Sequence, residues 1–181
     1  MSRYFLDDVY YFITVPTVDH QPFFNNPKLK QLLLEKMNQV FDKFFLGDRD
    51  YSIIDNHYHF IAYFQKGNII PNVLKLINGS TGKAVRDTLG TSGRVWDEYH
   101  VYVASTEQIY ERIRGYVIGN SLKHGEVVDL EELMKHPYST FSEVVRENGK
   151  EYAEELVNSS IYMEENQFFN PQSTQTGSEI R

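Results

Sequence analysis

The sequence predicts an α+β domain in which helices cover one antiparallel sheet. Segments rich in aromatic and β-branched residues, which favour strands, alternate along the chain with segments whose apolar residues recur at helical spacing. The two kinds of segment do not follow the regular spacing of parallel βαβ units. We therefore expect the strands to form a ferredoxin-like split arrangement rather than a parallel sheet.

Each predicted element has a local signal in the sequence. Pro16 requires the first strand to end or to lie at an edge, whereas Pro27 suits the opening turn of the first helix. Gly79 and Gly82 predict a break or a loosening in the second helix, and Ser-Thr-Glu-Gln at 105–108 resembles a capping box that opens the third. The expected strands are 10–18, 53–64 and 94–103, and the expected helices are 27–46, 68–89, 105–123 and acidic helices after 128.

Length and composition limit the kind of protein. The chain has 181 residues, of which 41% are hydrophobic, and this suits one globular domain followed by a tail. The absence of cysteine excludes disulfides, thiolate zinc sites and cysteine nucleophiles. The first residues lack the pattern of a signal peptide, and no run reaches the length of a membrane span. We expect a cytoplasmic protein that makes no contact with membranes.

Charge is distributed unevenly along the chain. The net charge of −7 argues mildly against a nucleic-acid partner. However, residues 28–94 contain ten basic and six acidic residues, whereas 95–181 contain seven and sixteen. The basic part includes four cations that form either a solvated face or a phosphate-binding one: Lys66, Lys75, Lys83 and Arg86.

Two histidines lie two residues apart in the strand-forming run at 53–64. Because side chains alternate between the faces of a strand, His57 and His59 project from one face. The other face is apolar, with Tyr58, Phe60, Ala62 and Phe64. Two imidazoles at this spacing are half of a site for a divalent metal, although such pairs also occur on strands that bind no metal.

An amide lies in the apolar stripe of the third helix. Ile109, Ile113, Tyr116 and Asn120 recur at spacings of four, three and four, so they share the face that packs inward. A buried polar group without a partner costs about 1–3 kcal/mol. We therefore expect Asn120 to be hydrogen-bonded, to contact water, or to coordinate an ion.

Four segments in this order resemble the single-tyrosine HUH transposases, especially the REP-associated tyrosine transposases. I-T-V-P-T-V-D-H-Q-P-F-F looks like the first strand and turn of that family, and I-I-D-N-H-Y-H-F is similar to its Asn-His-hydrophobic-His strand. G-R-V-W-D-E-Y-H-V-Y-V resembles its Trp-containing strand, and Y-V-I-G-N-S-L-K-H-G-E-V its nucleophile helix. The resemblance covers roughly residues 10–141.

The resemblance implies an HUH endonuclease-type fold and the roles of individual residues. It makes Tyr116 the nucleophile, His57 and His59 metal ligands, and Asn120 a candidate third ligand. The chain departs from the family pattern at Ile54-Asp55, at Val101-Tyr102 and at Ser121, where the family has Met-Pro, an acidic residue with a histidine, and proline.

These roles imply a metal-dependent single-strand DNA endonuclease and strand transferase that forms a 5′-phosphotyrosine intermediate. The cofactor would be magnesium or manganese, and the partner single-stranded or hairpin DNA, bound by a monomer or a homodimer. Residues 1–145 would be the catalytic domain, and 146–181 an acidic helical extension with a mobile tail. The alternatives are an inactive, domesticated nucleic-acid-binding module and, less favoured, a hydrolase of small phosphoesters.

Overall fold

The computed structural model describes residues 5–164 of the chain, and the order of its elements is ferredoxin-like. A four-stranded antiparallel sheet has the strand order β2-β3-β1-β4. The strands are β1 Val9–Pro16, β2 Arg49–Ile54, β3 His57–Phe64 and β4 His100–Val103. Because α1 (Pro27–Lys43) follows β1 and α2 (Ile70–Leu89) follows β3, the sheet is the split arrangement that the sequence predicts.

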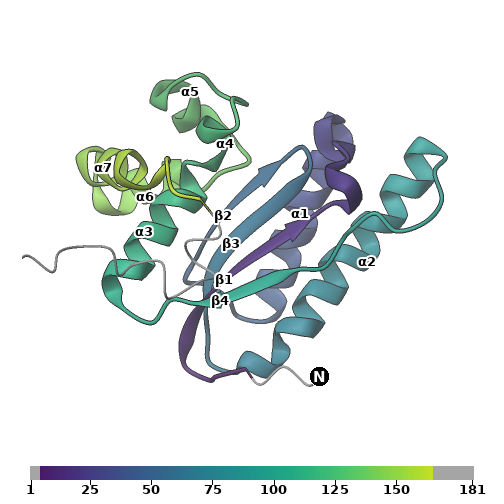
Figure 1. Ribbon diagram of the computed structural model, residues 1–181, viewed down its shortest axis with the longest axis horizontal. Helices are drawn as coiled ribbons and strands as arrows, with labels where there is room; N and C mark the ends of the chain where they lie inside the picture. The colour runs from purple at the N-terminus through teal and green to yellow at the C-terminus, as the bar shows by residue number, and fades with distance from the viewer. Residues whose placement is uncertain (1–4, 165–181) are drawn as a thin grey trace, which may run out of the picture.

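Helices cover both faces of the sheet (Figure 1). The long helices α1 and α2 lie on one face, and α3 (Glu107–Ile118) lies on the other. The shorter helices form a lobe beside α3 with its own apolar core. They are α4 Asn120–Lys123, α5 Leu130–Lys135, α6 Phe141–Asn148 and α7 Lys150–Ser160.

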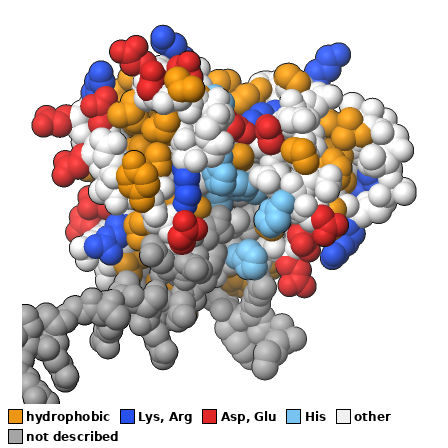
Figure 2. Space-filling view, turned by 45° about the horizontal axis from the view of Figure 1, so that its top comes forward, with side chains coloured by type: hydrophobic (Ala, Val, Ile, Leu, Met, Phe, Trp, Pro, Cys, Tyr) orange, Lys and Arg blue, Asp and Glu red, His pale blue; other side chains and the backbone are white. Residues whose placement is uncertain are grey.

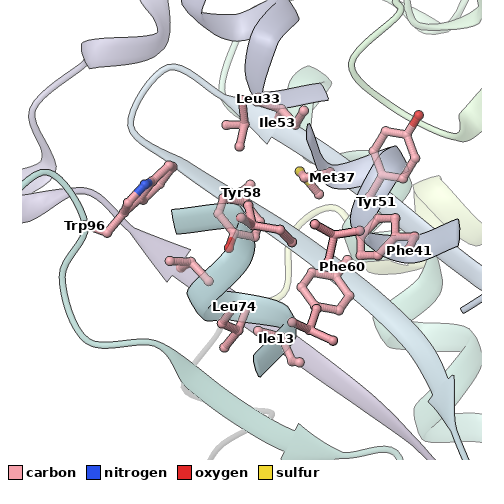
Figure 3. Close-up of a cluster of buried hydrophobic side chains, with 14 of the residues drawn as sticks. Ile13, Leu33, Met37, Phe41, Tyr51, Ile53, Tyr58, Phe60, Leu74 and Trp96 are labelled. Carbon is pink, nitrogen blue, oxygen red and sulfur yellow. The ribbon is translucent and has the colours of Figure 1, made fainter. Parts of the chain in front are cut away.

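The main core lies between the sheet and the helices α1 and α2. Aromatic and aliphatic side chains from both layers interdigitate there (Figure 3), including Ile13, Met37, Phe60 and Leu74. Trp96 closes one end of this core, where its ring stacks on Phe24 at 4.8 Å between centroids and its indole N–H donates to Thr81 Oγ1 at 3.0 Å.

Two strand predictions need correction. The run 53–64 is not one strand, because Asp55 and Asn56 form a tight turn between β2 and β3, so that Ile54 pairs with His57. The predicted strand 94–103 is regular only at its end, in β4. The side chain of Trp96 is drawn into the main core, and only an isolated bridge joins Trp96 to Thr17.

Two helix predictions also need correction. The helix α2 is continuous through Gly79 and Gly82 and ends at Gly90, whose φ of 64° is left-handed. Packing holds it together, since Gly82 lies against Val95 and Trp96. The predicted helix 105–123 is divided at Gly119 into α3 and α4.

The predicted domain boundary between residues 145 and 146 falls inside α6. The acidic helical extension corresponds within the described residues to the end of α6 and to α7, and the predicted mobile tail lies outside them. No helix between residues 5 and 164 is long and apolar enough to cross a bilayer.

Candidate active site

The two inner strands of the sheet position the predicted histidines. His57 and His59 lie on β3 opposite Pro16 and Thr14 of β1, and their rings are 4.6 Å apart between centroids. His59 is fully buried, with Nδ1 at 2.8 Å from Thr14 Oγ1. The alternation predicted for this strand is confirmed, because Tyr58, Phe60, Ala62 and Phe64, on the face opposite the histidines, belong to the main core.

Close contact between α3 and α7 directs Tyr116 toward the histidines. A Cβ atom on Gly115 would lie only 2.1 Å from the carbonyl oxygen of Leu156, so the two helix backbones are in contact there. The opposite side of α3 faces the sheet, where the Tyr116 ring lies 6.0 Å from Phe12 and 5.5 Å from His59 between centroids. Tyr116 is only 2% exposed.

Asn120 opens α4 and faces His57, as expected for an amide with a role. Its Oδ1 lies 3.2 Å from His57 Nε2, and the residue is fully buried. Its Nδ2 has no hydrogen-bond partner among the described residues. The amide is therefore held by the histidine site rather than by the helix.

Hydrogen bonds fix which nitrogen of His57 carries the proton. Asn56 donates through Nδ2 to the carbonyl oxygen of His20 at 3.3 Å, so its Oδ1 is an acceptor. His57 Nδ1 lies 2.6 Å from that oxygen and donates to it. The lone pair of His57 Nε2 therefore points at Asn120 Oδ1, and two acceptors face each other.

Burial keeps the imidazoles of the site neutral. Desolvation, followed by the charge of His124, lowers the pKa of His57 to about 4. Burial lowers the pKa of His59 well below its ordinary value, and burial followed by Lys123 lowers that of His124. Neutral imidazole is the form that binds metals.

The site opens into a pocket of about 320 Å³ that sequence reasoning did not foresee as a whole. Figure 2 shows histidines gathered in a hollow at the centre of one face. The lining residues are Thr14, Pro16, His20, Asn56, His57, His100, Tyr116, Lys123, His124 and Glu164. The sequence did contain a signal for one of the lining residues that were not predicted: His124 follows Asn120 by one helical turn and so lies on the same side of the helix. The centre of its ring lies 4.9 Å from that of His57.

The donor set fits a divalent ion in part. Within residues 5–164, no group of three or more His, Asp or Glu side chains could hold a metal. The candidate set is instead His57, His59 and the amide oxygen of Asn120. The lone pairs of His57 Nε2 and Asn120 Oδ1 face each other, and a cation shared between them would satisfy both. The other ring nitrogen of His57, Nδ1, donates to the amide oxygen of Asn56, and such a second hydrogen bond is usual for histidines that bind metals.

The cations predicted to bind nucleic acid do not converge on this pocket. Lys75, Lys83 and Arg86 lie on α2, across the sheet from the histidines. Lys66 follows the far end of β3 and pairs with Asp7 at 2.7 Å. Among the residues that line the pocket the cation is Lys123, whose Nζ lies 4.7 Å from the centre of the Tyr116 ring and donates to the carbonyl oxygen of Met163.

A network of ion pairs around the buried Lys30 connects the segment that carries His57 with the segment that carries Asn120. Glu126, shortly after α4, accepts from Lys30 Nζ at 2.7 Å and from the backbone N–H of Asp55 at 2.9 Å. Lys30 also pairs with the Asp55 carboxylate at 2.9 Å. This network therefore anchors the turn before His57 to the segment after Asn120.

The fold and the pocket together define a ferredoxin-like α+β domain in which histidines of the inner strand β3 and a tyrosine of α3 meet at one site. Comparison of the sequence with protein-family models and with curated proteins finds no match. Among solved structures, the chain is similar to the REP-associated tyrosine transposase bound to a REP hairpin, with a TM-score of 0.67 and 18% identity over 84% of this chain and 88% of that chain. A Deinococcus radiodurans R1 protein with a provisional transposase name is similar with a TM-score of 0.43 and 14% identity, over 64% of this chain and 93% of that chain. The chain has a REP-associated tyrosine transposase-like fold.

Proposed function

We propose that the protein is a metal-dependent single-strand DNA endonuclease and strand transferase with Tyr116 as its nucleophile. The observation that carries this proposal is that Tyr116 of α3 and His57 of β3 line one pocket, with Asn120 of α4 buried against His57. The fold likeness supports it, because the similar solved structure is a tyrosine transposase bound to a DNA hairpin. We therefore assign hairpin or single-stranded DNA as the substrate.

The proposed reaction exchanges one phosphate ester for another. The phenolic oxygen of Tyr116 attacks the scissile phosphorus, and the phenol loses its proton. The bond from phosphorus to the 3′ oxygen breaks, and that oxygen leaves as a 3′-hydroxyl after it takes up a proton. The 5′ phosphate stays on Tyr116 as an ester, so a 3′-hydroxyl of another strand can reverse the step without ATP.

The residues around Tyr116 would meet the electrostatic needs of this reaction. A phenol has a pKa of about 10 and is a weak nucleophile at neutral pH. Magnesium or manganese, held by His57, His59 and Asn120, would supply a Lewis acid for the phosphate. Lys123 adds a positive charge beside the Tyr116 ring, where it can attract a phosphate into the pocket.

The experiment that tests this function detects the covalent intermediate. Hairpin DNA with a single-stranded flank is labelled at its 3′ end, incubated with protein and manganese, and separated under denaturing conditions. Wild type should retain the label, whereas Tyr116→Phe should not, because the substitution removes one oxygen and leaves the ring in place. Tyr110→Phe is the matched control, since Tyr110 lies on the same helix and contacts Tyr10 instead of the histidines.

Further arms test the metal and the number of subunits in a site. A His57→Ala, His59→Ala double variant should form no adduct and should bind manganese more weakly than wild type in calorimetry. Equal metal affinity would contradict the assigned ligands. Mixing this double variant with Tyr116→Phe distinguishes a monomer from a homodimer with shared sites, because only shared sites restore the adduct.

The second candidate function is an inactive module that binds nucleic acid. The observation that favours it is the burial of Tyr116, which leaves 2% of the residue exposed. In that case, wild type should bind the hairpin reversibly and form no adduct with magnesium, with manganese or with a chelator. If wild type and Tyr116→Phe both form the adduct, the result would contradict the assignment of Tyr116 as the nucleophile and also the inactive nucleic-acid-binding module.

A further inference from the structure

A second cavity, a groove along α2, lies next to the segment that leads into His100. It has a volume of about 410 Å³ and lies between α2 and the chain from Arg94 to Tyr99. Figure 1 shows this part of the chain running back beside the helix toward β4. The residues that line this α2 groove include Lys75, Gly79, Gly82, Arg86, Arg94 and Tyr99.

A glycine in the groove has no explanation within the fold. A Cβ on Gly82 would make ordinary packing contacts with Trp96 at 3.6 Å and with Val95 at 3.7 Å. A Cβ on Gly79, in contrast, would have no atom within 4 Å. Because glycine is unfavourable inside a helix, its presence at an open position leaves the helix backbone accessible to a ligand there.

Positive charge surrounds this opening. Lys75, Arg86 and Arg94 line the groove, and Lys75 has no acidic partner among the described residues. Arg94 lies 3.5 Å from Asp97, but both side chains are largely exposed, so the pair is weak. The groove therefore attracts an anionic ligand.

The remaining walls are apolar and aromatic. Leu74, Trp96 and Tyr99 line the groove beside the three cations. The rings of Trp96 and Phe24 stack in the main core, so the partly exposed Tyr99 is the aromatic side chain that can meet a base. Cations that follow a phosphate backbone, together with aromatic rings that stack on bases, are the combination that binds single-stranded nucleic acid. A groove of this volume accommodates a short stretch of single strand.

The groove and the histidine pocket are adjacent along the chain. Tyr99 lines the groove, and the next residue, His100, lines the pocket. From this placement we infer that the α2 groove binds the single-stranded segment of DNA that flanks the cleaved phosphate. The inference rests on the proposed function for the identity of the cleaved strand, and its binding test does not require cleavage.

The experiment fills the groove without disturbing the pocket. Gly79→Leu places a side chain in the open position, and Ser80→Leu places the same side chain on the next residue, which is exposed and outside the groove. Affinity for a fluorescent single-stranded oligonucleotide is measured by anisotropy. Gly79→Leu should bind about tenfold more weakly, as expected for one lost stacked base, whereas Ser80→Leu should bind as wild type does.

Salt dependence tests the cations separately. Combined substitution of Lys75, Arg86 and Arg94 by glutamine should reduce the slope of log affinity against log salt by about 2, since each phosphate contact on a single strand contributes about 0.7. The matched control replaces Lys66 and Lys83 by glutamine. These two lie outside the groove, paired with Asp7 and Asp87, and their loss should leave the slope unchanged.

Each outcome separates this inference from the proposed function. Weaker binding by Gly79→Leu, together with normal adduct formation at saturating oligonucleotide, supports both. If Gly79→Leu binds more weakly but wild type forms no adduct, the inference about the α2 groove stands and the proposed nuclease function is contradicted. Equal affinities of Gly79→Leu and Ser80→Leu, with both variants folded by thermal unfolding, overturn the groove, as does an absence of binding by wild type. Gly79-dependent binding of a polyglutamate peptide in place of the oligonucleotide would assign the groove to an acidic protein segment and would also overturn it.

Discussion

The two faces of the sheet serve different purposes, although they are built from alternate residues of the same strands. On β3, Tyr58 and Phe60 lie in the main core beneath α1 and α2, whereas His57 and His59 lie under α3. The first face is stabilised by apolar burial, which tolerates no polar group without a partner. The second face carries polar groups: Thr14 lies beside His59 Nδ1 and Asn56 beside His57 Nδ1, whereas His57 Nε2 faces the oxygen of Asn120. The difference teaches that alternate residues of one strand can form a hydrophobic core on one face and a candidate site on the other.

The largest expected effect is the loss of stability from the apolar face. Phe60→Ala removes a fully buried ring and should lower the free energy of unfolding by about 3–5 kcal/mol. His57→Ala removes one hydrogen bond, to Asn56, worth about 1 kcal/mol, and should cost clearly less. Urea denaturation of both variants measures the difference. A larger loss from His57→Ala would mean that the histidine face is structural.

The histidine face should make stability depend on pH. An unfolded histidine takes up a proton near pH 6.5, whereas His57, with its pKa lowered to about 4, stays neutral in the folded state. The unfolded state therefore binds more protons between these values, and stability falls as the pH falls. His57 alone should account for a loss of about 2 kcal/mol from about pH 7 to about pH 5.

Denaturation at several pH values checks this slope, with His57→Gln as the comparison. The range stays above the ordinary pKa of glutamate, so that Glu126, whose pKa is lowered to about 2, does not contribute. His57→Gln should show a flatter dependence. The same slope in both proteins would contradict the assignment to His57.

Glycine substitutions on the two sides of the sheet should have opposite signs. Gly115→Ala forces a Cβ into the carbonyl oxygen of Leu156 at 2.1 Å, so α3 and α7 must separate. We expect a loss of about 1–3 kcal/mol, as for other overpacked sites, together with slower adduct formation because Tyr116 moves. Thermal unfolding and the adduct assay measure the two effects, and an unchanged adduct rate would show that the position of Tyr116 tolerates the shift.

The smallest expected effect is a gain. Gly79→Ala adds a Cβ where the structure has open space, so the helix propensity of alanine should stabilise the fold by about 1 kcal/mol. Thermal unfolding again provides the measurement. A loss in place of a gain would mean that the α2 groove is narrower than the structure indicates.

The fold could be predicted where the signal was periodic. The alternation on β3 and the stripe on α3 and α4 identified which residues face inward, and both agree with the structure. The strand β2 was missed, because Ile53 and Ile54 run into the histidine strand with only Asp55 and Asn56 between them. The continuity of α2 could not be read from its glycines, since it depends on contacts of Gly82 with the distant Val95 and Trp96.

The sequence predicted only those members of the candidate site that lie within a few residues of one another along the chain. Two histidines in one strand, and a tyrosine and an amide in one helix, could each be found within a few residues. The joining of His20, His100 and His124 to one pocket requires the tertiary fold. The separation of the α2 cations from that pocket also follows from the fold, because charge along a sequence does not reveal which side of the sheet a helix covers.

The burial of the Tyr116 ring restricts how this site can be redesigned. The ring belongs to the apolar cluster that joins α3 to the sheet, together with Phe12, Ile61 and Val117. Replacement of Tyr116, the proposed nucleophile, by serine or cysteine would therefore open a cavity in that cluster as well as alter the proposed chemistry. Any such exchange requires compensating substitutions at Phe12 or Ile61, so the reactive group and the packing around it can only be replaced together.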